Sequence, residues 1–89
     1  MLEPTDEEIK AHILFKLYWK RYWGGKHTAL ESVKKGIPKH LGGRYIDMAT
    51  ELIKEGLINI KPTSYGPQIS LNPKHRGEII ERAERFARK

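Results

Sequence analysis

The chain has 89 residues, enough for one small domain (residues 1–89), and its 17 lysines and arginines against 11 acids give a formal net charge of +6. It contains no cysteine, which excludes a disulfide framework and a thiolate metal site. No apolar run approaches the ~18 residues of a membrane span, and the N-terminus lacks the basic residues of a signal peptide, so we expect a cytoplasmic protein without a membrane partner.

The charge is distributed unevenly along the chain. Residues 1–8 hold four acids and no base, whereas residues 9–46 hold nine lysines and arginines against Glu31 alone, a net +8. A basic block of this size favours a polyanionic partner, and nucleic acid is the usual one. The alternative is a generally basic protein that has no such partner.

A first helix is expected from Asp6 to Tyr22 or Trp23, after an acidic tail at residues 1–5. Thr5 and Glu8 have the spacing of a capping box at its start, and Gly24-Gly25 would end it. Apolar residues occupy nearly its whole circumference, which is typical of a helix that is covered on two sides. The second cover is expected to be the C-terminal helix, a symmetry mate, or both.

The run Tyr18-Trp19-Lys20-Arg21-Tyr22-Trp23 allows two interpretations. Aromatic rings interleaved with basic residues can form a platform on which bases stack. However, Tyr18/Tyr22 and Trp19/Trp23 are i,i+4 pairs on the expected helix, a spacing that suits packing, and stacking platforms usually lie on sheets or loops. We therefore favour packing in the core or a dimer, with a homodimer interface formed by Leu14, Tyr18, Trp19, Tyr22, Ile79 and Phe86.

A short second helix is expected from a capping box at Thr28 and Glu31 through Lys35, closed by Gly36. Residues 26–27 before it would supply a short first strand. Pro38 prevents this helix from continuing, and residues 38–41 are expected to form a helical turn of their own.

A third, amphipathic helix is expected at about residues 42–55. Gly56 follows where a helix C-terminus favours positive φ. Residues 57–61 then form a β-branched strand, residues 62–67 a turn, and residues 68–71 an alternating return strand. The side chains on the apolar side of the helix are Tyr45, Met48, Ala49, Leu52 and Ile53.

The last helix is expected at about residues 73–88, with Asn72 as its N-cap and Pro73 as its first residue. Its apolar stripe consists of Ile79, Ile80, Ala83, Phe86 and Ala87. Three acid–base pairs at i,i+4 spacing are expected to form a solvated face: Glu78/Arg82, Glu81/Arg85 and Glu84/Arg88.

The helix that ends on Gly56 and the ribbon that follows it resemble the second half of a winged-helix domain. The runs Leu52-Ile53-Lys54-Glu55-Gly56-Leu57-Ile58 and Ile69-Ser70-Leu71-Asn72-Pro73-Lys74 are similar to the recognition-helix end and the wing exit of small MarR-like and ArsR-like regulators. The resemblance covers residues 9 to 80. It implies an α+β, mostly helical fold, a winged helix-turn-helix of three helices and a β-hairpin wing with an added C-terminal helix. The link from Gly36 to Arg44 is longer than the usual turn.

The resemblance implies a small, homodimeric transcriptional regulator that binds double-stranded DNA, with helix 42–55 in the major groove and the wing at residues 61–67 on the backbone or minor groove. The two recognition helices of a dimer would lie roughly 34 Å apart. Arg44 is the expected base-reading residue, with Thr50 and His40 behind it. Tyr65 would either contact the DNA or pack back on the hairpin. The expected DNA-binding residues are Lys34, Lys35, Lys39, His40, Arg44, Thr50, Lys54, Lys61, Ser64 and Tyr65.

Asp47 and Glu51 lie on the exposed side of the same helix, where phosphates would repel a carboxylate unless it accepts from a cytosine amino group. Lys54 and Arg44 are expected to neutralise them within the helix. Asp47 and Glu51 leave open the alternative of a protein-docking winged-helix module in a larger assembly, without direct DNA readout. Catalytic motifs are absent and the four histidines are scattered, so we expect no enzyme activity, no metal and no cofactor. A small-molecule effector is not defined by the sequence.

Overall fold

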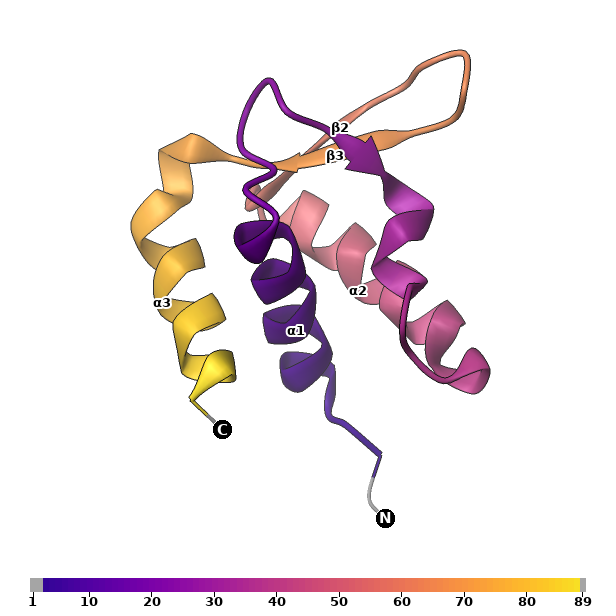
Figure 1. Cartoon of the computed structure of the whole chain (residues 1–89), viewed down its shortest axis with the longest axis vertical. Coiled ribbons are helices and arrows are strands. Elements are labelled where there is room, and N and C mark those ends of the chain that lie inside the picture. The colour runs from indigo at the N-terminus through magenta and orange to yellow at the C-terminus, as the bar shows by residue number, and fades with distance from the viewer. Residues whose placement is uncertain (1–2, 89) are drawn as a thin grey trace.

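The computed structural model describes residues 3–88, which form three α-helices and a small antiparallel sheet (Figure 1). The elements in chain order are α1 (Asp6–Trp19), β1 (Thr28–Ala29), the 3₁₀ turns η1 (Leu30–Lys34) and η2 (Lys39–Leu41), α2 (Gly42–Lys54), β2 (Ile58–Lys61), β3 (Gln68–Leu71), the 3₁₀ turn η3 (Pro73–His75) and α3 (Arg76–Ala87). The α+β, mostly helical class is therefore confirmed. Within the described residues no helix is long and apolar enough to cross a membrane.

The first helix begins where expected but ends earlier than expected. Thr5 and Glu8 form the predicted capping box, in which each backbone N–H donates to the other residue's side chain. The helix stops at Trp19 because Arg21 adopts φ 60°, and the N–H of Tyr22 donates to the carbonyl of Leu17 at 3.0 Å. This hydrogen bond satisfies a carbonyl in the last turn of the helix, as is usual where a left-handed residue ends a helix. The left-handed residue is usually glycine, but here it is Arg21.

Backbone hydrogen bonds to the distant strand β3 explain why the helix cannot continue to Trp23. The N–H of Leu71 in β3 donates to the carbonyl of Tyr22 at 2.7 Å, and the N–H of Gly24 donates back to Leu71 at 3.1 Å. To make these bonds, residues 22 and 23 leave the helix and Gly24 turns with φ 53°, so the predicted i,i+4 helical pairs Tyr18/Tyr22 and Trp19/Trp23 do not form.

The second helical segment is shorter and tighter than predicted. The first strand is Thr28–Ala29 rather than residues 26–27, and Thr28 pairs with Ile69 of β3. Because Thr28 lies in the sheet, the predicted capping box with Glu31 does not form, and Ala29 stands at the N-cap of η1. Gly36 closes the segment with φ 76°, and η2 is the separate turn expected before α2.

The predicted helix-to-ribbon stretch is confirmed to within one or two residues. Gly56 has φ 84° after α2, and the N–H of Leu57 donates to the carbonyl of Leu52 at 3.0 Å. The sheet order is β1-β3-β2, with Ile60 of β2 opposite Ile69 of β3. The hairpin loop at residues 62–67, here called the wing, projects beyond the body of the molecule (Figure 1).

The last helix begins later than expected. Asn72 caps the turn η3 by accepting from the N–H of Lys74 at 3.0 Å, and Pro73 occupies the first position as predicted. The regular α-helix follows only from Arg76.

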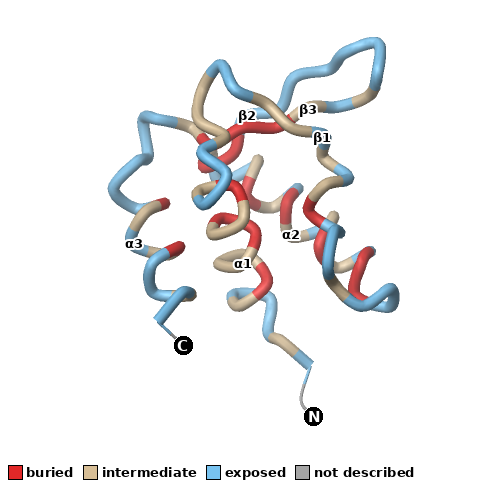
Figure 2. The backbone as a smooth tube through the Cα atoms, in the orientation of Figure 1, coloured by how far each residue is buried: buried red, intermediate tan, exposed pale blue. Residues whose placement is uncertain are grey.

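The core lies around α1, which α2 and α3 flank on either side (Figures 1 and 2). The all-round apolar character of α1 is thus explained by two covers from the same chain, one of them the C-terminal helix. Leu14 of α1 and Ile79 of α3 are fully buried between these helices. Leu14 and Ile79 therefore cannot contribute to the predicted homodimer interface.

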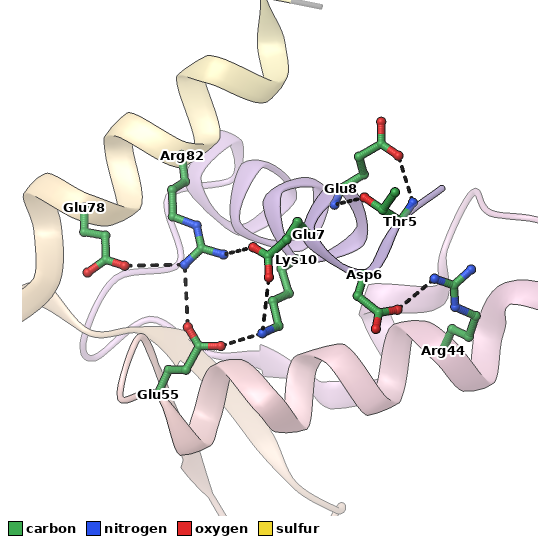
Figure 3. A network of polar contacts seen from close by, with 9 residues as sticks. All are labelled: Thr5, Asp6, Glu7, Glu8, Lys10, Arg44, Glu55, Glu78 and Arg82. Atoms are coloured by element: carbon green, nitrogen blue, oxygen red, sulfur yellow. Dashed lines mark hydrogen bonds and ion pairs between the residues drawn. The ribbon is translucent and has the colours of Figure 1, made fainter. Parts of the chain in front are cut away.

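The expected solvated face of α3 is partly an internal network (Figure 3). Arg82 pairs with Glu78 at 3.4 Å as predicted, but its side chain is only 15% exposed because it also contacts Glu7 of α1 and Glu55 at the end of α2. Lys10 donates to Glu55 at 2.6 Å, and this hydrogen bond raises the pKa of Lys10 against the opposing effect of burial. The network joins three helices, whereas Arg85 makes only its i,i+4 pair with Glu81 at 2.6 Å.

Candidate nucleic-acid interface

The ten predicted DNA-binding residues lie on three segments around α2, and nine of them are exposed. In Figure 1 the link at residues 35–41 and the wing lie at the same lateral edge of the molecule, with the wing above the link. By segment, Lys34, Lys35, Lys39 and His40 lie on η1, η2 and their link; Arg44, Thr50 and Lys54 lie on α2; and Lys61, Ser64 and Tyr65 lie on β2 and the wing.

The acidic N-terminal segment contacts the start of α2. Asp6 accepts from the Arg44 guanidinium at 2.8 Å (Figure 3), and Glu3 lies 3.2 Å from His40. The contact arises because the first turn of α1 packs beside the first turn of α2. Two of the three residues expected to read bases, Arg44 and His40, thus lie beside carboxylates of the same chain. The sequence signal for this contact is the opposite charge of residues 1–8.

The middle and end of α2 present a nearly neutral outer face. Thr50 donates its hydroxyl to the carbonyl of Ile46 at 2.9 Å, one turn earlier on the same helix. Lys54 lies 3.7 Å from Glu51, so one of the two expected neutralising pairs is present. Arg44 does not supply the other pair because Asp6 holds it, and Asp47 remains exposed.

Three lysines beside α2 remain free for an external anion. Lys35, Lys39 and Lys61 are exposed and have no ion pair among residues 3–88. Lys34 differs because it pairs with Glu31 at 2.7 Å. The lysines expected to hold phosphates are therefore mostly available, whereas the residues expected to read bases are occupied.

The wing has a fixed shape and an outward-directed aromatic ring. Thr63 donates its hydroxyl to the carbonyl of Gly66 at 2.6 Å, and it accepts from the N–H of Tyr65 at 3.1 Å. Tyr65 is 95% exposed, so it does not pack back on the hairpin. Contact of Tyr65 with DNA stays a prediction.

The inner side of this region is anchored to α1 through two polar side chains. Lys16 donates to the carbonyls of Val33 at 3.0 Å and Lys35 at 2.7 Å, which hold the end of η1 in place. Burial, with a smaller effect of the Lys35 charge, lowers the pKa of Lys16. His12 is hydrogen-bonded to the hydroxyl of Tyr45, and burial raises the pKa of that phenol.

Three half-buried members of the predicted dimer interface have their own contacts within the chain. Tyr18 donates its hydroxyl to Glu84 at 3.3 Å, and Phe86 stacks on His12 with ring centroids 4.8 Å apart. Tyr22 is half-buried and lies under Lys26. Trp19 is the exception, since 71% of it is exposed.

Comparison of the chain with protein-family models, curated proteins and solved structures found no match. The function proposed for the chain is therefore based on its own geometry.

Proposed function

We propose that the chain is a winged-helix domain that binds duplex DNA as a small transcriptional regulator, with α2 in the major groove and the wing on the backbone or minor groove. The observation that carries the proposal is the set of three unpaired lysines, Lys35, Lys39 and Lys61, on the two segments that flank α2. Lysines in such positions can each neutralise a phosphate, while the helix between them enters the groove.

The element order supports the same proposal. A helix, a short strand, two 3₁₀ turns, a second α-helix and a hairpin follow one another along the chain, and the strands form a sheet of order β1-β3-β2. The exposed ring of Tyr65 at the wing tip adds a group that can reach backbone or groove. Base reading by Arg44 requires that a phosphate or base edge displace Asp6 from the guanidinium.

The test is the salt dependence of duplex binding, measured by fluorescence anisotropy on labelled random duplex DNA. We expect steep weakening with salt, and the double variant Lys39→Ala/Lys61→Ala should reduce the slope by about 2, one for each lost phosphate contact. Lys74→Ala, which removes one lysine charge from η3, is the control and should leave the slope nearly unchanged. Binding that is flat with salt, or unchanged in the double variant, would contradict the proposal.

The homodimer stays a prediction. Of the six side chains assigned to it, Leu14 and Ile79 are buried within the chain, and the exposed Trp19 is surrounded by basic residues that oppose contact with a second copy. Light scattering with and without duplex DNA measures the mass directly.

A protein-docking domain is the second candidate, and one observation favours it. The outer face of α2 carries exposed Asp47 and a Glu51–Lys54 pair, while Arg44 is held by Asp6. A helix face that carries both acidic and basic side chains can contact a polar protein surface as well as the groove of DNA. Weak duplex binding together with co-purification of a defined partner, lost on Asp47→Lys, would support this candidate over DNA binding.

A further inference from the structure

A second basic surface surrounds Trp19 at the C-terminal end of α1, apart from α2 and the wing. Trp19 is the most exposed tryptophan, at 71%, and its ring stacks on Phe15 with centroids 5.9 Å apart and an interplanar angle of 27°. Phe15 therefore supports one face of the indole, and the exposure leaves the other face open to solvent. We call the residues around this ring the Trp19 surface; they are Phe15, Tyr18, Trp19, Lys20, Arg21 and Arg76.

Trp19 separates two recesses in this surface. One, of about 490 Å³, lies between the aromatic rings of Tyr18, Trp19 and Trp23 and the side chains of Arg21 and Arg76. The other, of about 380 Å³, lies on the side of Phe15 and Lys20 and reaches Lys35. Volumes of this size are in the range of small-molecule sites and can admit a flat ring beside the indole.

The charge of the Trp19 surface is positive and uncompensated. Lys20, Arg21 and Arg76 have no ion pair within the described part of the chain, unlike the basic residues at the start of α2. Arg76 instead lies over the Trp23 ring, 4.8 Å from its centroid. The nearby carboxylate of Glu84 accepts a hydrogen bond from the Tyr18 hydroxyl.

Arg21 occupies a backbone position that glycine would fill more easily. Its φ of 60° is in the left-handed region, which L side chains rarely adopt. The guanidinium is carried on this turn, at the rim of the larger recess, beside the exposed indole.

From these features we infer that the Trp19 surface binds single-stranded nucleic acid. A base stacks on the open face of the Trp19 indole, and Lys20, Arg21 and Arg76 contact the adjacent phosphates. Aromatic rings flanked by basic side chains are the usual means of binding single strands without sequence preference. Trp19 is the last residue of α1, and Lys20 and Arg21 lie in the turn that follows, so the indole stands at the end of the helix with basic residues directly after it.

Two other occupants fit the same surface less well. A second copy of the chain would bring Lys20, Arg21 and Arg76 against their own equivalents, which repel one another. A membrane surface would favour a protruding apolar patch, whereas here basic side chains line recesses on both sides of the ring.

The test compares two exposed aromatic residues on two probes, a labelled single-stranded oligothymidine and a labelled duplex. Trp19→Ala should weaken binding of the single strand roughly 5- to 150-fold, which is the range for loss of one stacked base, and leave duplex binding nearly unchanged. Trp19→Phe should retain most of the affinity because it retains a ring. Tyr65→Ala removes an aromatic ring on the wing that is even more exposed than Trp19, so it is the control and should not affect the single strand.

The outcomes separate this inference from the proposed duplex function. Lys35 borders both surfaces and stays unchanged in every variant. If Trp19→Ala leaves single-strand binding unchanged, or weakens both probes equally, the inference is wrong whatever the Lys39→Ala/Lys61→Ala result. It is also wrong if Trp19→Ala halves the mass measured by light scattering. Shifted tryptophan emission with phosphatidylglycerol vesicles, but not with the oligothymidine, overturns it in favour of a lipid surface.

Discussion

At the residue scale, His12 is the ionisable group whose setting most clearly links pH to stability. It lies between three helices, hydrogen-bonded to Tyr45 of α2 and stacked on Phe86 of α3 at 4.8 Å and 8°. Burial, and then the charge of Lys16 on its own helix, lowers the pKa of His12 below its ordinary value of 6.5. The folded state therefore favours the neutral imidazole.

The pH dependence follows from this lowered pKa. Above 6.5 the imidazole is neutral in both states, whereas below 6.5 the unfolded chain binds the proton first, so stability falls as pH falls toward the folded-state pKa. We expect urea denaturation from about pH 8 to about pH 5 to show a larger loss of stability for the native chain than for His12→Gln. The other ionisable groups are the same in the native chain and in His12→Gln. A difference in the free energy of unfolding between the two that stays constant across this pH range would therefore contradict the prediction.

At the element scale, the acidic first turn of α1 acts against the surface proposed for DNA. Asp6 holds Arg44 at 2.8 Å and adds a negative charge where a phosphate would lie. Asp6→Asn keeps the side-chain size and removes that charge. Because the Asp6 carboxylate is 63% exposed, we expect duplex affinity to rise by only about 5-fold at most, the factor for ~1 kcal/mol.

The control for Asp6→Asn is Glu81→Gln, which removes an equally exposed carboxylate from the outer side of α3. Anisotropy on the same duplex measures both variants. An equal gain in both would indicate only the change in net charge, and no gain in Asp6→Asn would show that Arg44 does not contact the DNA.

The Arg82 network should contribute far more to stability than the other ion pairs of α3. Arg82 contacts acids on α1, α2 and α3 and is 15% exposed, whereas the Arg85 side chain is 65% exposed and makes one pair. We expect Arg82→Ala to lower the free energy of unfolding by about 1–3 kcal/mol and Arg85→Ala by roughly 0.3 kcal/mol. Urea denaturation of the two variants measures the difference, and equal losses would show that the network adds nothing beyond a surface pair.

At the scale of the whole molecule, the parts that the sequence predicted well depend on local rules. The Gly56 cap, the start of α1 at Thr5 and the return strand at residues 68–71 are determined by neighbouring residues, and each lies where expected. The lysines beside α2 were also identifiable, because charge on a link between helices is normally exposed.

The parts that were missed depend on residues far apart in the chain. The early end of α1 follows from backbone bonds between Tyr22 and Leu71, and the covering of Arg44 follows from Asp6, 38 residues away. The Arg82 side chain is mostly buried because it forms ion pairs with Glu7 of α1 and Glu55 at the end of α2. Periodicity and capping rules contain no information about such partners, so one sequence could not reveal them.

The separation of the wing from the core affects how the protein can change over evolutionary time. Residues 61–65 are all exposed, and the bonds between Thr63 and Gly66 close the loop without help from any helix. Substitutions there leave the folding of the rest almost untouched, so variation can accumulate at this site without loss of a folded protein. A lineage that acquires a new binding preference should therefore show its first differences in this loop.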